Sequence, residues 1–339
     1  MRAAVLHTPG DIRVESVPEP KATVGNVVVK VAAVGVCGSD LPRMLTKGAH
    51  RMPLICGHEF SGHVVDVGSG VTGYATGDLV TIPPLIPCNR CSQCLRGSFS
   101  RCEDYDYFGS RRDGAYAEFV EVPVSNLLKV PAGLDPAAAA MCDPAAIALH
   151  AVWNAGGLTV GKRGGVVGCG PIGLFAIQWL RLLGARDVVA VDISEKKLAM
   201  AREAGATHTF LGTDAVPPEL LCDVVIEAGG NSATIGRAIT MTGPGGHAAF
   251  IGIPTSDVAL ENKTFQHFLR QEISLHGSWN SFGEPFPGDQ WTVSLDRLAS
   301  GDLKWQFMIT HDLDLDALPK TFASFGDPSI LFSKVLFRP

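Results

Sequence analysis

The chain has 339 residues, of which 46% are hydrophobic and 18% charged, and its formal net charge is −6. At about 100–200 residues per domain, this length predicts roughly two domains, each with a core of its own. The apolar fraction excludes a disordered or fibrous chain, and the acidic charge argues against a surface built to bind a polyanion. We therefore expect a globular protein that does not bind nucleic acid.

The sequence predicts neither export nor a membrane anchor. Residues 1–10 hold a short apolar run that His7 and Pro9 interrupt, which is unlike a signal peptide. The nearest approach to a membrane helix, 137–153, is broken by polar residues and falls short of about 18 uninterrupted apolar positions. We expect a cytoplasmic protein, whose nine cysteines are reduced thiols or metal ligands rather than disulfides.

The first 130 residues predict an irregular β domain. Short valine-rich runs separated by glycine and proline predict strands at 27–36, 63–67, 79–82 and 116–122.

From about residue 144, apolar strands alternate with helical stretches, which is typical of βαβ units on a parallel sheet. The run 188–191 has no polar alternation, which indicates helices on both sheet faces, and Gly184 and Gly205 predict left-handed helix ends. After about residue 275 the pattern predicts irregular structure up to a last strand at 334–337. The expected fold class is α/β. The strands of this part are expected at 165–167, 188–192 and 222–226, and its helices at 172–183 and 195–204.

A glycine-rich loop predicts a dinucleotide site. Gly168-Cys169-Gly170-Pro171-Ile172-Gly173 closes a strand and opens a helix, and its glycines permit a tight turn, a close pyrophosphate and close helix packing. Asp192 ends the next strand, where its carboxylate can accept hydrogen bonds from an adenosine ribose. This carboxylate would repel a 2′-phosphate, so NAD is favoured over NADP, although Lys196 and Lys197 follow. The alternative is a plain glycine turn beside a solvated aspartate.

Four cysteines at short spacing predict a structural zinc site: Cys88, Cys91, Cys94 and Cys102. Four thiolates can close a tetrahedron around zinc and leave no position open for a substrate. An iron–sulfur cluster uses the same ligands and is the alternative, although nothing else in the sequence indicates electron transfer. Arginines around this loop also allow a nucleic-acid-binding ribbon, but in an acidic chain solvated side chains are the simpler interpretation.

A second group of metal-ligand types lies in the predicted β domain: Cys37, His58, Glu59 and Asp143. Thiolate, imidazole and carboxylate together can hold zinc. Taken singly, each has an ordinary alternative as a buried thiol, a core histidine or a surface carboxylate.

Cys37-Gly38-Ser39-Asp40, Gly57-His58-Glu59, the cysteine loop and the glycine motif together resemble the zinc-dependent medium-chain dehydrogenase/reductase family. The resemblance covers the whole chain. It implies a GroES-like catalytic domain formed by 1–145 and 277–339, with a Rossmann NAD-binding domain at 146–276. It also implies two zinc ions per subunit, one catalytic and one structural, and a dimer or tetramer of identical chains. A zinc-free quinone reductase of the same fold is opposed by the cysteine and histidine residues.

By this resemblance, Cys37 and His58 are ligands of the catalytic zinc, and Glu59 matches a glutamate beside the metal. Asp143 stands where relatives carry a longer glutamate, so it binds zinc directly or through water. Asp40 would accept from the second ring nitrogen of His58 and fix its tautomer. Ser39 would be the first proton acceptor during alcohol oxidation.

The resemblance further implies a polyol phosphate substrate, whose secondary alcohol is oxidised by NAD to a ketone. The candidate substrate residues are Arg43, Arg111, Arg112, Trp279 and Asn280. Guanidinium groups can hold a phosphate through paired hydrogen bonds, but ordinary surface arginines are an equal alternative. An unphosphorylated polyol such as sorbitol or arabitol, or another secondary alcohol, is the second hypothesis.

Overall fold

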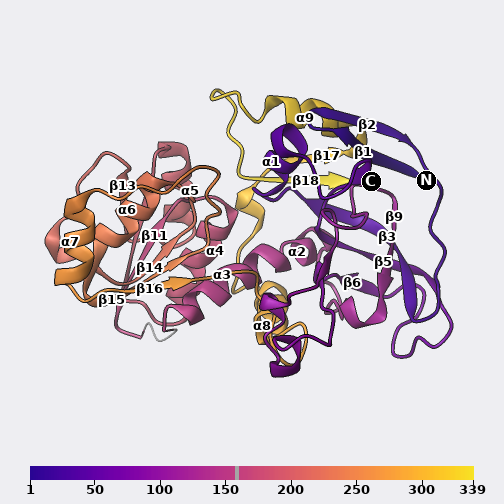
Figure 1. The fold of residues 1–339 in the computed structure, drawn as a ribbon, viewed down its shortest axis with the longest axis horizontal. Coiled ribbons are helices and arrows are strands. Elements are labelled where there is room, and N and C mark those ends of the chain that lie inside the picture. The colour runs from indigo at the N-terminus through magenta and orange to yellow at the C-terminus, as the bar shows by residue number, and fades with distance from the viewer. Residues whose placement is uncertain (157–159) are drawn as a thin grey trace. The chain divides into compact units, whose positions relative to one another are not determined.

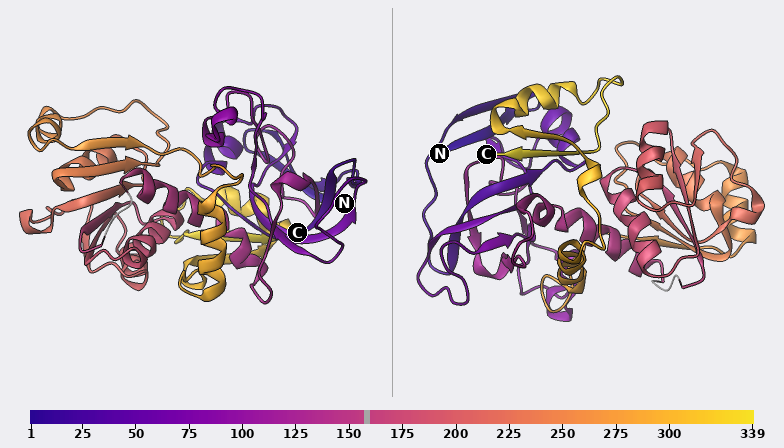
Figure 2. Two further views of the ribbon diagram at one scale, coloured as in Figure 1. Left: turned by 90° about the horizontal axis from the view of Figure 1, so that it is seen from below. Right: turned by 180° about the vertical axis from the view of Figure 1, so that it is seen from behind.

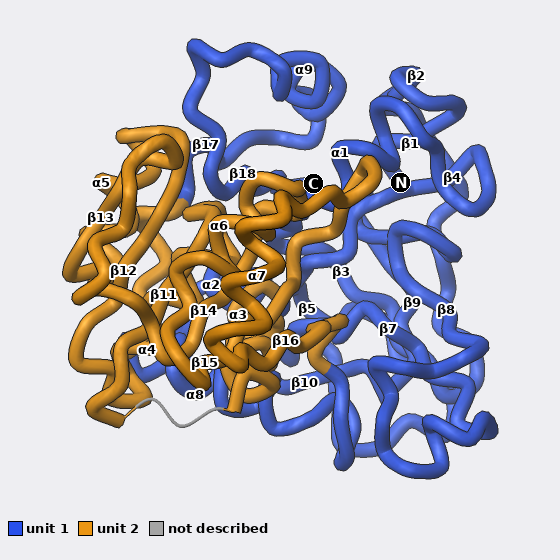
Figure 3. The backbone as a smooth tube through the Cα atoms, turned by 60° about the vertical axis from the view of Figure 1, so that its left-hand side comes forward, with its two compact units in different colours: residues 1–143, 282–301, 309–339 blue, residues 144–281, 302–308 orange. Residues whose placement is uncertain are grey.

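The computed structural model describes residues 1–156 and 160–339 (Figures 1 and 2). These residues group into two compact units (Figure 3). Unit 1 comprises 1–143, 282–301 and 309–339, and unit 2 comprises 144–281 and 302–308. The domain ranges expected from the sequence stay a prediction, and they differ from these units at 144–145, 277–281 and 302–308.

Unit 1 is built on β strands, most of them antiparallel. The strands are β1 (Arg2–Thr8), β2 (Asp11–Ser16), β3 (Asn26–Gly35), β4 (Leu54–Ile55), β5 (Glu59–Val67), β6 (Leu79–Thr81), β7 (Leu85–Ile86), β8 (Asp106–Tyr107), β9 (Phe119–Pro123), β10 (Leu128–Lys129), β17 (Ile309–Asp314) and β18 (Lys334–Arg338). The largest sheet has the order β10-β6-β5-β3-β18-β17, and β9 also pairs with β3. A smaller sheet has the order β2-β1-β4, and β7 pairs with β8.

The two ends of the chain share the largest sheet. Leu336 of β18 pairs with Gly35 of β3, so the yellow last strand lies beside the indigo third strand (Figure 1). Apolar residues of β3 and β18, among them Val29 and Phe337, are buried in one core with Leu6 of β1 and Phe60 of β5.

One sequence prediction in unit 1 is wrong. Irregular structure was expected after residue 275, but α8 (Asp289–Ser300) is a regular helix. Trp291, Leu295 and Leu298 are buried at the three- and four-residue spacing of one helix face, and Gly301 ends the helix with a φ of +78°. The neighbouring prolines and aromatic residues obscured this period. The other helices of unit 1 are α1 (Asp40–Pro42), α2 (Pro136–Ala140) and α9 (Leu318–Ser324).

Unit 2 is a doubly wound α/β fold. Its strands are β11 (Arg163–Val167), β12 (Asp187–Asp192), β13 (His208–Leu211), β14 (Cys222–Glu227), β15 (Thr242–Phe250) and β16 (Ser274–Gly277). They are all parallel, in the order β13-β12-β11-β14-β15-β16, which is the Rossmann strand order. The helices are α3 (Cys142–Asn154, beginning in unit 1), α4 (Pro171–Leu182), α5 (Glu195–Glu203), α6 (Ser232–Met241) and α7 (Asn262–Arg270).

Local expectations for unit 2 are confirmed. Residues 188–191 are buried, as expected of a strand covered on both faces. Gly184 and Gly205 have φ values of +93° and +108° after α4 and α5. Within the described part of the chain, no helix combines the length and apolarity needed to cross a membrane.

Candidate active site and metal centres

Strand register brings Cys37, His58 and Glu59 together in unit 1. Gly35 pairs with Glu59 across β3 and β5, so Cys37, just beyond the end of β3, lies close to His58. Cys37, His58 and Glu59 each offer one possible ligand atom, and these three atoms lie within 4.8 Å of one another. A thiolate, an imidazole and a carboxylate at this spacing could hold one zinc ion.

The environment of Cys37 favours its metal-binding form. Burial raises the pKa of the Cys37 thiol, but the positive charge of His58 and hydrogen bonds with His58 and Ser39 lower it to about 7. A substantial thiolate fraction therefore exists near neutral pH, and the thiolate is the form that binds metals.

Asp143 is a buried carboxylate without a protein partner. It lies in the first turn of α3, and neither of its side-chain oxygens has a hydrogen-bond partner among the described residues. Burial raises the pKa of Asp143 to about 7, and the charge of His58 only partly opposes this. Because an uncompensated buried carboxylate is costly, a cation beside Cys37 and His58 would fit this residue. Direct or water-mediated binding by Asp143 stays a prediction.

Asp40 accepts several hydrogen bonds beside Cys37 and His58. Its carboxylate accepts hydrogen bonds from the Cys37 backbone N–H (3.1 Å), Tyr116 Oη (3.0 Å) and Arg43 Nη1 (2.6 Å). Its Oδ1 atom lies 3.4 Å from His58 Nδ1. Burial raises the pKa of Asp40, but the charges of His58 and Arg43 lower it to about 2. Asp40 is thus an anion held by three donors beside His58, whose Nδ1 atom has no hydrogen-bond partner among the described residues.

Sequence reasoning missed a buried ion pair beside the same group. Lys334, the first residue of β18, contacts Oε2 of Glu59 and donates a hydrogen bond to the Val36 carbonyl (3.2 Å). Both side chains are at most 3% exposed. Burial lowers the pKa of Lys334 to about 8, although the negative charges of Cys37 and Asp40 oppose this. The one signal in the sequence was a lysine opening an otherwise apolar last strand.

Two of the three predicted phosphate arginines already have ionic partners. Arg43 has a side chain only 17% exposed and is paired with Asp40. The Arg112 guanidinium lies 3.5 Å from the Asp106 carboxylate, while the exposed Arg111 stacks over the Tyr105 ring at 4.4 Å.

The remaining predicted residues are placed as follows. Ser39 is half-buried at the start of α1, and Tyr107, which the sequence did not single out, packs edge-on against the His58 ring at 5.6 Å. Trp279 is 50% exposed, and it and Asn280 follow β16 in unit 2. Their part in a substrate pocket stays a prediction.

The four loop cysteines form a compact cluster. Their Sγ atoms all lie within 4.8 Å of one another, and the Sγ atoms of Cys88 and Cys94 are 3.9 Å apart. Zn–S bonds of about 2.3 Å in a tetrahedron place sulfur atoms about 3.8 Å apart, so the cluster has the size of a zinc site. Backbone N–H groups of Cys88, Cys91 and Cys94 donate to Sγ atoms of the cluster, which stabilises thiolates.

The glycine motif of unit 2 has the geometry of a phosphate-binding loop. Gly168 has a φ of +93°, and a Cβ atom on Gly173 would collide with the Gly168 carbonyl. Gly170 caps the N-terminus of α4, and a Cβ there would meet no atom within 4 Å, so its backbone is open to a ligand. The positive end of α4 can therefore receive a pyrophosphate.

The Asp192 carboxylate ends β12 beside this loop. It accepts hydrogen bonds from the backbone N–H groups of Cys169 (2.7 Å) and Ser194 (2.9 Å). The loop and its acidic residue are therefore held together before any ligand binds.

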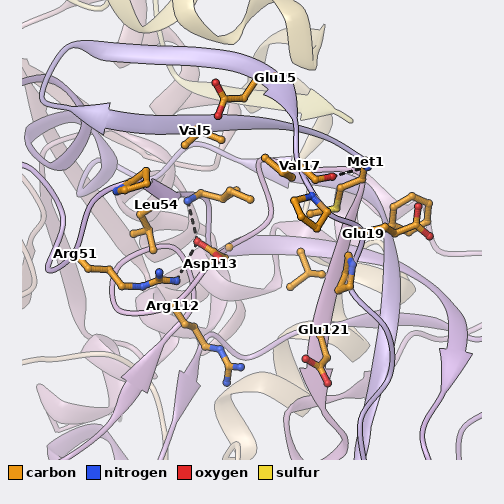
Figure 4. Close-up of a pocket in the computed structure, with 17 residues that line it drawn as sticks. Met1, Val5, Glu15, Val17, Glu19, Arg51, Leu54, Arg112, Asp113 and Glu121 are labelled. Atoms are coloured by element: carbon orange, nitrogen blue, oxygen red, sulfur yellow. Dashed lines mark hydrogen bonds and ion pairs between the residues drawn. The ribbon is translucent and has the colours of Figure 1, made fainter.

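A cavity of about 600 Å³ lies elsewhere in unit 1 (Figure 4). None of the predicted zinc ligands lines it, and its Arg51 lies 3.2 Å from Asp113. Its lining includes Arg112 but also four carboxylates, those of Glu15, Glu19, Asp113 and Glu121, and this excess of negative charge disfavours a phosphate guest.

Comparisons with known proteins agree with these features. The family model described as an alcohol dehydrogenase GroES-like domain matches residues 23–132, and that of a zinc-binding dehydrogenase matches residues 171–298. The chain is 39% identical over 321 residues to galactitol 1-phosphate 5-dehydrogenase of Escherichia coli K12, covering 92% of each chain. It is 29% identical over 330 residues to sorbitol dehydrogenase of Bacillus subtilis, covering 93% of this chain and 91% of the relative.

Solved structures give the same result. The crystal structure of galactitol-1-phosphate dehydrogenase from E. coli superposes with a TM-score of 0.94 at 35% identity, over the full length of both chains. A protein of Sinorhizobium meliloti 1021 that is described as a zinc-binding dehydrogenase, and is bound to NADP, has a TM-score of 0.90 at 31% identity, covering 100% of this chain and 99% of that one.

Proposed function

Because this chain belongs to the zinc-dependent medium-chain dehydrogenase/reductase family, we propose that it oxidises a secondary alcohol of a polyol phosphate to the ketose phosphate, with hydride transfer to NAD. Galactitol 1-phosphate is the proposed substrate, and tagatose 6-phosphate the product. The observation that carries this choice is the identity of 39% over 92% of the chain to an enzyme of that specificity.

The proposed catalytic centre consists of Cys37, His58 and Asp143, with Glu59 as a further ligand. Zinc bound there would act as a Lewis acid that lowers the pKa of the substrate hydroxyl. Ser39 would accept the proton that this hydroxyl loses. Asp40 would hold the His58 ring in its ligand orientation, as its contact with Nδ1 supports.

We also propose a structural zinc at Cys88, Cys91, Cys94 and Cys102, which gives two zinc ions per subunit. Their mutual distances and N–H···S hydrogen bonds support this ligand set. All nine cysteines are free, which agrees with the proposed cytoplasmic location. A homo-oligomer, dimer or tetramer, is proposed by family resemblance alone.

NAD is proposed over NADP because the Asp192 charge would repel a 2′-phosphate. We expect Asp192→Asn to raise the ratio of kcat/KM for NADP to that for NAD by at least about tenfold. Steady-state kinetics with both coenzymes checks this. Asp187→Asn, at the opposite end of the same strand, is the matched control and should leave the ratio unchanged. A wild-type enzyme that prefers NADP would refute the assignment.

The substrate is tested by following NADH formation with galactitol 1-phosphate and with galactitol at matched concentrations. A large preference for the phosphate is expected. Equal rates would exclude the phosphate-specific proposal and favour a neutral polyol.

One structural observation favours that second candidate, an unphosphorylated polyol. Arg43 and Arg112 each face a carboxylate, so part of the positive charge that a phosphate would need is already compensated.

Arg43→Gln separates the two roles of Arg43. If Arg43 acts by holding Asp40, the substitution lowers kcat/KM for galactitol 1-phosphate and galactitol by the same factor, about tenfold or more. A loss confined to the phosphate would instead show that Arg43 binds the phosphate group. We expect the equal loss. Arg13→Gln, whose partner is Asp11, is the control and should change neither rate.

A further inference from the structure

Two histidines meet on neighbouring strands at the edge of the unit 2 sheet. His247 lies on β15 and His276 on β16, the edge strand (Figure 1). The Nδ1 atom of His247 lies 3.0 Å from the Nε2 atom of His276, and the ring centroids are 5.2 Å apart. Neither residue belongs to the proposed zinc sites, the glycine motif or the predicted substrate set.

Strand register produces this approach. His247 pairs with Ser274, and Ala249 pairs with His276. Paired residues share a face of the sheet, and side chains alternate along each strand. His247 and His276 therefore lie on the same face as diagonal neighbours, offset by two residues along the strands. Both rings are half-buried, while Ser274 and Gly277 beside His276 are exposed in the single chain.

The separation of the two nitrogens suits a chelated metal ion. Metal–imidazole bonds of about 2.0–2.1 Å place two adjacent ligand nitrogens about 2.9 Å apart at a right angle and about 3.4 Å apart at the tetrahedral angle. The 3.0 Å separation lies within this range, so one metal ion could bind both nitrogens in place of the shared proton once each ring turns its lone pair toward the ion.

The protonation state also suits a metal. Burial and the neighbouring His247 lower the pKa of His276. His276 is therefore more fully neutral near pH 7, and a neutral imidazole is the ligand that a metal requires.

We propose that His247 and His276 form a two-histidine site for a divalent transition-metal ion, with the remaining coordination positions open to water. Imidazole ligands suit Ni²⁺, Cu²⁺ and Zn²⁺ rather than Mg²⁺ or Ca²⁺, which prefer oxygen. This site is independent of the proposed dehydrogenase activity.

Titration calorimetry of the zinc-loaded, full-length protein with Ni²⁺ tests the proposal, since Ni²⁺ does not oxidise thiols. We expect one Ni²⁺ per chain, and an affinity at least about tenfold lower in His247→Gln and in His276→Gln. The double variant should lose no more than either single variant, because a chelate needs both rings. His208→Gln, on the opposite edge strand β13, is the matched control and should bind like the wild type.

The proposal would be overturned if His276→Gln bound Ni²⁺ as tightly as the wild type, or if His208→Gln lost as much Ni²⁺ affinity as His276→Gln. His247 and His276 would then form a hydrogen bond and no metal site. A second measurement needs no variant. With ¹³C-labelled histidine, substoichiometric Ni²⁺ should broaden the resonances of two of the ten imidazoles, whereas uniform broadening, or none, would contradict the site.

Discussion

Replacing Asp40 with asparagine is expected to lower kcat/KM for alcohol oxidation by about 10–100-fold, the usual effect of losing a carboxylate that orients a metal-binding histidine. The wild-type carboxylate accepts three hydrogen bonds, from Cys37, Arg43 and Tyr116, and it lies 3.4 Å from His58 Nδ1 as an ion-pair partner. An asparagine amide has a single acceptor oxygen, and its NH₂ group would face one of these donors. The His58 ring then loses its fixed tautomer.

The measurement combines steady-state kinetics with elemental analysis. We expect zinc to fall by up to one ion per chain, with the cysteine-loop zinc kept. Asp316→Asn removes an exposed partner of Arg2 and should leave both quantities unchanged. A folded Asp40→Asn protein with wild-type kcat/KM and zinc content would exclude the positioning role of Asp40.

The grouping of Cys37, His58 and Glu59 could be predicted because their motifs resemble those of a known family, and the structure brings the three side chains together. The residues that position them could not be. Lys334 reaches the group from β18 and Tyr116 from the segment before β9, both far along the chain, so their contacts depend on the tertiary fold, which no local pattern reveals.

The pairing of Arg43 with Asp40 could not be predicted from the sequence either. A guanidinium six residues from a thiolate could as well face a substrate phosphate, and only the folded turn shows it paired with Asp40. By contrast, the tight turn and close helix packing of the glycine loop in unit 2 could be predicted from the sequence, because they depend on backbone conformation within one short segment.

Replacing Lys334 with methionine is expected to reduce the free energy of unfolding by about 3–5 kcal/mol, the usual cost of removing one partner of a buried ion pair. Methionine retains much of the side-chain volume, so the loss comes from leaving the Glu59 carboxylate buried and uncompensated. Urea unfolding of the wild type and the variant measures it. Lys129→Met removes the exposed partner of Asp78 and should have little effect.

The double variant Lys334→Met/Glu59→Gln checks the cause. Removing both charges should recover most of the stability, since an uncharged pair of similar volume avoids the uncompensated carboxylate. If the double variant is as unstable as Lys334→Met, lost packing and not charge explains the effect.

The single variant Lys334→Met also tests whether Glu59 contacts the catalytic metal. A zinc ion bound by Glu59 would compensate its charge when Lys334 is absent. Lys334→Met should then be destabilised less in the zinc-loaded protein than after chelation, relative to the wild type in each state. An equal penalty in both states would show that Glu59 serves Lys334 alone, which would leave Cys37, His58 and Asp143 as the proposed ligands.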